Sequence, residues 1–358
     1  MEKVTGTSAA LTIGIDLGDL WSVAIELDGL GDVVRRERIR TTRAGMESYL
    51  GGRCAAMVAI EVGTHSPWVS RVIASLGHEG IVANPRRVRL IGHSDRKNDA
   101  ADAERLARLA RADVRLLSPV RHKGEQAQKD RGLLCVRDGV VRARTLLINQ
   151  ARNLAKSLGL RISSCDAGAF AARAARELGE ERFAGQTQIL ALIAHLTTRI
   201  RVLDREIEAM ARERYPETER LRQVAGVGPV TSLAYVLCIE DPQRFERSRA
   251  VGSYLGLCPR QRDSGAQRPQ LRISKAGDGN VRRLLVQAAH YILGHFGPDT
   301  DLRRQGLQLI ARGGKAAGKR ARIAVARKLA VLLHRLWVSG EIYEPLRTAH
   351  ARERSAAA

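Results

Sequence analysis

A seven-residue repeat of apolar side chains in the middle of the chain restricts its fold more than any other feature. The apolar positions are spaced alternately four and three residues apart, at Ile189, Ile193, Leu196, Ile200, Leu203, Ile207 and Met210. Such spacing places all of them on one narrow stripe of an α-helix, which is the seam of a coiled coil. From Gln126 onward a second segment repeats apolar pairs every seven residues. The two segments predict an antiparallel helical hairpin or coiled coil, with a buried helix of a bundle as the alternative.

The residues before these helices predict a sheet. Segments 11–17 and 21–27 are apolar β-type runs, and segment 33–39 alternates apolar and charged residues as an edge strand does. Segments 56–62 and 80–84 have the pattern of two further strands. A short helix is expected around Met46, and a longer one with Pro67 near its start and Gly77 near its end. Three antiparallel strands followed by alternating strands and helices predict an α/β fold.

The chain is long enough for two or three domains. We predict an α/β domain over residues 1–125, a helical coiled-coil domain over 126–215 and a mostly α-helical domain over 216–358. The last domain begins with two helical patterns that flank the sequence GVGPVT at 226–231. Gly226 and Gly228 permit a tight turn whose backbone N–H groups face a phosphate, as in a helix-hairpin-helix motif. A plain helix–helix turn is the alternative.

The charge of the chain indicates a polyanionic partner. Lys and Arg number 60 against 38 Asp and Glu, which gives a formal net charge of +22. An excess of one sign on this scale favours nucleic acid as the partner. An acidic membrane surface is the alternative, but the chain has no amphipathic, lysine-rich tail with aromatic residues.

Other composition features exclude several classes of protein. No apolar stretch reaches about 18 residues, so no transmembrane helix is expected. The first residues lack the pattern of a signal peptide, and we expect a cytoplasmic protein. The five cysteines are far apart and form no CxxC pair, so neither a zinc site nor a disulfide framework is indicated.

Four carboxylates are candidates for a metal site. Asp16 and Glu61 each stand at the end of an apolar strand pattern, in GIDLG and AIEVG. Asp99 and Asp102 are three residues apart on an expected helix and so share one face of it. Hard oxygen ligands of this kind suit Mg²⁺ or Mn²⁺, and two such ions about 4 Å apart can serve phosphodiester exchange. Taken singly, each acid could instead cap a helix or pair with a cation.

A serine in an arginine-rich loop is a further candidate. Ser264 precedes a glycine and lies between Arg262 and Arg268. Flanking arginines can position a phosphate and stabilise the charge that develops on it. An ordinary loop turn is the far more common explanation of a serine–glycine pair, and composition alone would not select this residue.

The order of these blocks resembles one family. The sequence contains GIDLG, AIEVG, RKNDAADAERLA and GVGPVTS, followed by GSYLGLCPRQRDSG and ISKAGDGNVRRLL. This order, over residues 10–300, is similar to that of the DEDD-type insertion-sequence transposases, whose recombinase is guided by a structured bridge RNA. The resemblance implies an RNase H-like, RuvC-like fold for the N-terminal domain. It also implies that the metal-binding acids are Asp16, Glu61, Asp99 and Asp102.

The resemblance further implies a catalytic serine. Ser264 matches the family's position best, with Ser274 as a nearby competitor, and Ala266 stands where the family usually has glycine. In the family the serine attacks DNA and forms a covalent phosphoserine link, and the acidic site comes from another protomer. Nucleic-acid contacts are then expected from the second half of the chain, at Gly226, Gly228, Arg262, Arg268, Lys275 and Arg283.

The partners implied are donor and target DNA, a structured non-coding guide RNA and further copies of the chain in a dimer or tetramer. Such a protein would work on the bacterial nucleoid. Two other functions fit parts of the sequence. A RuvC-like junction endonuclease would use the four acids and water without the serine, and a non-enzymatic nucleic-acid-binding protein would use neither.

Overall fold

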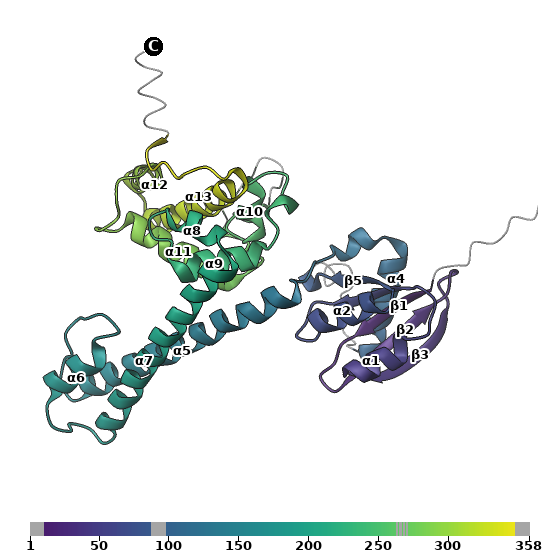
Figure 1. Ribbon diagram of the computed structural model, residues 1–358, viewed down its shortest axis with the longest axis horizontal. Coiled ribbons are helices and arrows are strands. Elements are labelled where there is room, and N and C mark those ends of the chain that lie inside the picture. The colour runs from purple at the N-terminus through teal and green to yellow at the C-terminus, as the bar shows by residue number, and fades with distance from the viewer. Residues whose placement is uncertain are drawn as a thin grey trace, which may run out of the picture. The chain divides into compact units, whose positions relative to one another are not determined.

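The computed structural model describes residues 11–86, 98–262, 264, 267, 269 and 271–347. The chain forms two compact units, Met1–Lys123 and Gly124–Ala358 (Figure 1). The predicted division into three domains stays a prediction.

The first unit is built on a five-stranded sheet in the order β3-β2-β1-β4-β5. Its strands are β1 (Thr12–Asp16), β2 (Trp21–Leu27), β3 (Val33–Arg40), β4 (Met57–Glu61) and β5 (Glu79–Ala83). β1 pairs antiparallel with β2, and β2 pairs antiparallel with β3. β4 runs parallel to both β1 and β5. The five predicted strands are therefore confirmed, and so is the mixed α/β character of this part of the chain.

Helices cover both faces of the sheet. On one face, α1 (Arg43–Leu50) and α2 (Ser66–Ser75) pack through Met46, Val69 and Ile73 on side chains such as Ile15 and Ile60. On the other face, α4 (Asp99–Ala112) packs on β2 and β4. A short 3₁₀ helix, η1 (Val114–Leu117), follows α4. The core of this unit thus has three layers, with the sheet in the middle.

Local sequence signals explain where these helices begin. Thr42 caps α1, because its hydroxyl accepts a hydrogen bond of 3.1 Å from the backbone N–H of Gly45. Pro67 stands in the first turn of α2, where its missing N–H costs nothing. Asn98 caps α4 by accepting a bond of 3.0 Å from the N–H of Ala100. Gly77, at a φ of +81°, turns the chain after α2.

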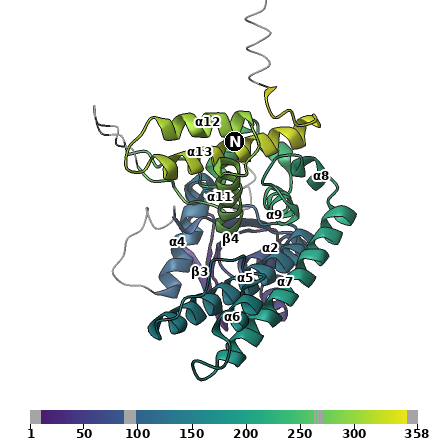
Figure 2. The same cartoon turned by 90° about the vertical axis from the view of Figure 1, so that its left-hand side faces the viewer.

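Two long helices begin the second unit. α5 (Glu125–Ser157) and α7 (Gln186–Arg214) lie side by side, with α6 (Phe170–Leu178) at the end away from α11 and α13 (Figures 1 and 2). The start of α5 shares a core with the end of α7, through Leu134 and Ile207. The end of α5 shares another with the start of α7, through Ala151 and Ile193. The two helices are therefore antiparallel, as predicted, whereas a coiled coil stays a prediction.

The remaining helices form the rest of the second unit. They are α8 (Glu217–Arg222), α9 (Pro229–Ile239), η2 (Pro242–Arg244), α10 (Arg249–Tyr254), α11 (Gly279–Leu293), α12 (Asp301–Ala311) and α13 (Ala317–Ser339). α9 is buried along its length, and the hydroxyl of its Tyr235 donates a bond of 2.7 Å to the carbonyl of Ala330 in α13. Among the helices of the described residues, none is both long and apolar enough to cross a membrane.

Candidate active site and nucleic-acid interface

The register of β1 and β4 places two predicted acids side by side. Ile15 pairs with Ile60 in this parallel ladder, and Asp16 and Glu61 are the next residues of their strands. Successive side chains of a strand point to opposite faces, so Asp16 shares a face with Gly14, and Glu61 shares a face with Ala59. Both Gly14 and Ala59 pack against α4. The two carboxylates therefore lie at one end of the sheet, on the face that α4 covers.

The direction of α4 brings the other two acids to the same end. Arg108 and Arg111, in the second half of α4, donate hydrogen bonds to the carbonyls of Gly31 and Gly29. These glycines follow Leu27, which pairs with Thr12 at the opposite end of β1 from Asp16. The first turn of α4, which carries Asp99 and Asp102, therefore lies toward Asp16.

A close approach between α4 and β1 makes this arrangement possible. A Cβ atom on Gly14 would lie 2.0 Å from the carbonyl oxygen of Ala103, so only glycine fits at this position of β1. The residue that follows Asp102 in α4 is thus in backbone contact with the strand that ends in Asp16. A larger residue at position 14 would push the helix away from the sheet.

The four acids do not form a complete ligand shell. Asp102 is paired with Arg105 at 2.9 Å, and its side chain is about a quarter exposed. Asp16 and Glu61 are half-buried, and each has a polar or electrostatic partner. Within the described ranges, no three His, Cys, Asp or Glu side chains are arranged to hold a metal ion. The acids lie toward one end of the sheet, and carboxylate oxygens are the type of donor that a hard divalent cation prefers.

We call the end of the sheet that carries Asp16 and Glu61 the acidic end. A histidine that the sequence analysis did not select lies beside it. His65 Nε2 is 3.5 Å from Asp19 Oδ1, which joins the loop after β1 to the start of α2. The indole N–H of Trp68 donates a bond of 3.2 Å to Nδ1 of the same ring. The loops that carry Asp19 and His65 each follow a strand that ends in a predicted acid. That position in the sequence was the signal that could have indicated His65.

The predicted nucleophile lies in a short hairpin of the second unit. Ser264 exchanges two backbone hydrogen bonds with Gln267, of 3.2 and 3.0 Å, and is exposed. Further back, Pro259 bridges to Ile273, and the N–H of Ser274 donates a bond of 2.9 Å to Cys258. Ser264 is therefore nearer the tip and Ser274 nearer the base. Arg262 is exposed on the same hairpin, whereas Arg268 and Ala266 lie outside the described residues.

Two glycines anchor the base of this hairpin. A Cβ atom on Gly256 would lie 2.3 Å from the carbonyl oxygen of Ala276, and one on Gly277 would lie 2.1 Å from that of Tyr254. Both glycines have a φ of +67°, which a residue with a side chain rarely adopts. Arg282 of α11 donates bonds of 2.9 and 2.7 Å to the carbonyls of Leu255 and Ala276. The base is thus held by backbone contacts that exclude side chains.

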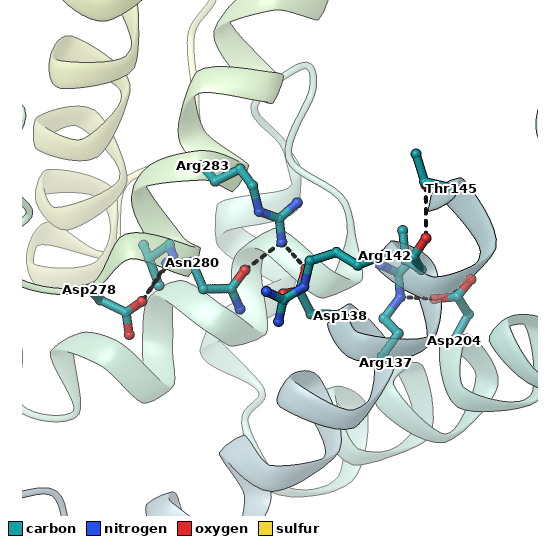
Figure 3. Close-up of polar contacts among 10 residues, drawn as sticks. Arg137, Asp138, Arg142, Thr145, Asp204, Asp278, Asn280 and Arg283 are labelled. Atoms are coloured by element: carbon teal, nitrogen blue, oxygen red, sulfur yellow. Dashed lines mark hydrogen bonds and ion pairs between the residues drawn. The ribbon is translucent and has the colours of Figure 1, made fainter. Parts of the chain in front are cut away.

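Two predicted cations near this base differ in their surroundings. Lys275 is exposed and has a φ of +55°. Arg283 is also exposed, but it donates to Asp138 of α5 and, at 2.6 Å, to Asn280 (Figure 3). Asp138 also pairs with Arg142, at 3.0 Å. The charge of Arg283 is therefore partly neutralised, which makes it a weaker candidate for phosphate binding.

The predicted glycine turn joins α8 to α9. Gly226 has a φ of +82°, and a Cβ atom there would lie 3.0 Å from the carbonyl oxygen of Ala288 in α11. Gly228 is exposed, and its carbonyl accepts the first hydrogen bond of α9, from Ser232 at 2.9 Å. A packed turn between two helices is confirmed, whereas phosphate binding by this turn stays a prediction.

Comparisons with known proteins place this architecture in a family. The model of the DEDD transposases of IS110 elements matches residues 13–159, and that of the transposase IS116/IS110/IS902 family matches residues 218–303. The chain is 30% identical to the transposase for insertion sequence element IS1111A of Coxiella burnetii, covering 92% of this chain and 90% of the relative. It is 27% identical to a probable family 20 transposase of Pseudomonas aeruginosa, and the match covers 93% of this chain and 98% of that relative.

A third relative, the transposase for insertion sequence element IS1328 of Yersinia enterocolitica, is 30% identical over 77% of this chain and 82% of its own length. A chain with these matches is a transposase, an enzyme that cleaves and rejoins DNA. It belongs to the DEDD-type insertion-sequence transposases.

Proposed function

We propose that this transposase exchanges DNA strands through a covalent serine intermediate, with divalent metal held by Asp16, Glu61, Asp99 and Asp102. The observation that carries the proposal is the adjacent placement of Asp16 and Glu61 on parallel strands, with the first turn of α4 directed to the same end. The three antiparallel strands followed by parallel ones support an RNase H-like, RuvC-like fold for the first unit.

Each group has a defined chemical task in this proposal. The four carboxylates hold Mg²⁺ or Mn²⁺, which when bound would stabilise negative charge on the phosphodiester oxygens. The oxygen of Ser264 forms a bond to phosphorus while the bond from phosphorus to a DNA oxygen breaks. The serine hydroxyl gives up its proton, and the departing DNA oxygen takes up a proton and becomes a free DNA hydroxyl. The exposed Arg262 guanidinium attracts the phosphate. A second DNA end then displaces the serine, which restores the hydroxyl.

The proposal includes the partners of the reaction. A structured non-coding RNA pairs with donor and target DNA, so that base pairing selects the sequence while the protein holds the backbone. The net charge of +22 supports the binding of such polyanions. The exposed hairpin of Ser264 supports a site completed by the acids of another protomer, in a dimer or tetramer joined through a coiled coil. The turn between α8 and α9 would contact a phosphate, as a helix-hairpin-helix motif does. The reaction would take place on the nucleoid in the cytoplasm.

Trapping of the covalent adduct tests the serine. The full chain is incubated with end-labelled DNA of the element, RNA transcribed from its flanking region and Mg²⁺, and the products are separated on a denaturing gel. We expect a protein–DNA adduct whose peptide contains Ser264. Ser264→Ala should remove the adduct, whereas Ser274→Ala should retain it. Cleavage without any adduct would instead indicate a hydrolytic nuclease.

Matched acid variants test the metal site. Asp16→Asn and Asp102→Asn should abolish both the adduct and cleavage, and a chelator should do the same to the unaltered chain. Asp32→Asn is the control, because Asp32 is exposed in the turn between β2 and β3, at the opposite end of the sheet from Asp16. Full activity of Asp16→Asn, or equal loss in Asp32→Asn, would contradict the proposed metal site.

A further inference from the structure

The edge strand of the first unit carries a row of arginines that the predicted site did not include. In β3, Arg36, Arg38 and Arg40 occupy alternate positions, and all three are exposed. Arg36 lies 3.4 Å from Glu104 of α4, so this row lies on the face that α4 covers. The end of the row, at Arg38 and Arg40, is next to the start of β2.

An exposed tryptophan completes this corner. Trp21 pairs with Arg40 in the ladder between β2 and β3, and Arg38 pairs with Val23. The guanidinium carbons of Arg38 and Arg40 lie 4.7 and 4.9 Å from the centroid of the Trp21 ring. The tryptophan keeps 38% of its surface exposed. We call Trp21, Arg38 and Arg40 the tryptophan–arginine corner.

The cations of this corner differ from their neighbours. In the part of the chain that the structure describes, neither Arg38 nor Arg40 has a carboxylate partner within 4.0 Å. By contrast, Arg35, Arg36 and Arg53 each pair with a glutamate. If Arg38 and Arg40 served to stabilise the fold, we would expect them to pair with nearby carboxylates as their neighbours do. Two planar cations without such partners, set over an exposed aromatic ring, are the groups that bind phosphates and stack on nucleic-acid bases.

The corner lies in line with the acidic end of the sheet. Val23 pairs with Asp16 on one side and with Arg38 on the other, so one row across the sheet runs from Arg38 through Val23 and Asp16 to Glu61. All four residues of this row point to the face that α4 covers. Arg38 and Asp16 are two strands apart, which corresponds to about 10 Å between their backbones.

We propose that the tryptophan–arginine corner binds a single strand of nucleic acid and directs it to the acidic end. An unpaired base stacks on Trp21, while Arg38 and Arg40 contact the neighbouring phosphates. A base within a duplex has no free face for such stacking, so the corner favours unpaired segments. The inference rests on the proposed function for the destination of the strand, and on the corner's own geometry for binding.

Photochemical crosslinking tests the binding site directly. Short single strands of DNA and of RNA, each with one iodouracil, are irradiated with the full chain, and the crosslinked peptides are sequenced. We expect an adduct at Trp21 with a single strand, and much less with the same strand in a duplex. The DNA and RNA arms show which nucleic acid is bound. Adducts on other residues only, with none at Trp21, would overturn the proposal.

Matched variants separate stacking from charge. Trp21→Ala should weaken binding of the short single strand roughly tenfold, whereas Trp21→Phe should retain most of it. Leu30→Ala is the control, because Leu30 is 85% exposed and lies beyond the other end of β2. Replacing Arg38 and Arg40 by alanine should reduce the salt-dependence slope by about 1.4, at about 0.7 per phosphate contact. Replacing both by lysine should retain the slope, and an unchanged slope in the alanine variant would contradict the proposal.

The acid variants distinguish this proposal from the proposed function. Asp16→Asn should retain the Trp21 adduct even though it loses cleavage, because stacking needs no carboxylate. If Asp16→Asn instead remains active, the metal proposal fails while the crosslink still tests the corner. If the Trp21 adduct is absent from an active chain, the corner fails and the proposed function stands.

Discussion

The hydroxyl of Tyr215 donates a hydrogen bond of 2.5 Å to Oδ2 of Asp130, which ties the end of α7 to the first turns of α5. Asp130 is almost fully buried, and its Oδ1 lies 2.9 Å from the guanidinium of Arg214 and accepts a bond of 2.9 Å from Gln126. Burial and the adjacent carboxylate raise the pKa of Tyr215 above its ordinary value. Asp130 therefore joins the ends of two helices that are far apart in sequence.

We predict that Asp130→Ala lowers the free energy of unfolding of the second unit by about 2 kcal/mol, because it removes several hydrogen bonds to a buried charge. Urea denaturation followed by circular dichroism measures the change. Tyr215→Phe should cost about 1 kcal/mol. Lys129→Ala is the control, since its exposed pair with Glu125 contributes little. Equal midpoints for the Asp130 and Lys129 variants would contradict this account.

The close backbone approach of Gly256 to Ala276, at the base of the Ser264 hairpin, leads to a second prediction. Gly256→Ala should destabilise the chain by at least about 2 kcal/mol, because it combines a backbone clash with a positive φ. Gly279→Ala, where the nearest atom is a flexible arginine side chain at 3.5 Å, should change stability by less than about 0.5 kcal/mol. Thermal unfolding compares the two variants, and a similar loss of stability in both would show that the backbone approach at Gly256 does not exclude a side chain.

The exposed side of α5 leads to a prediction about assembly. Ile200 of the predicted seam is buried within its own unit, so Ile200→Glu should destabilise the chain's own fold. Val136 and Leu146 of α5 are 56% and 68% exposed. If copies associate through this side, replacing both by glutamate should reduce the mass measured by light scattering while the circular dichroism spectrum stays the same. An unchanged mass would exclude this side of α5 as the contact.

Salt dependence separates the two predicted arginines of the second unit. Affinity for duplex DNA should fall about a thousandfold between roughly 50 and 200 mM salt if about six phosphates are contacted. Arg262→Ala should reduce the slope by about 0.9, because this exposed side chain can contact a phosphate. Arg283→Ala should reduce it less, because Asp138 already pairs with that guanidinium. The opposite order of the two variants would contradict this assignment.

Much of the fold follows from local patterns in the sequence. The alternation in segment 33–39 predicts an edge strand, and the continuous apolar runs around Ile13, Ile25 and Val58 predict strands that are buried on both faces. Pro67 and Gly77 mark the ends of α2 for equally local reasons. The repeat between Ile189 and Met210 predicts a long helix with one apolar side. Each of these features depends on neighbours within a few residues, so the sequence alone suffices.

The candidate site was predictable only in part. The ends of two strand patterns indicated Asp16 and Glu61, and helical spacing grouped Asp99 with Asp102. Which face of the sheet each acid occupies depends on the packing of α4 against Gly14 and Ala59. The sequence around Asp16 contains no information about the direction of a helix that begins more than eighty residues later.

The sequence by itself determined the element types, the excess positive charge and the family, because these depend on composition, periodicity and the order of motifs. Only the tertiary structure decided which side chains meet. The pairing of β2 with β3 places Arg38 over Trp21, and the tertiary fold of the second unit brings Arg283 of α11 to Asp138 of α5. The physical reason is that strand register and helix packing join residues that are distant in sequence, and no local pattern specifies such partners.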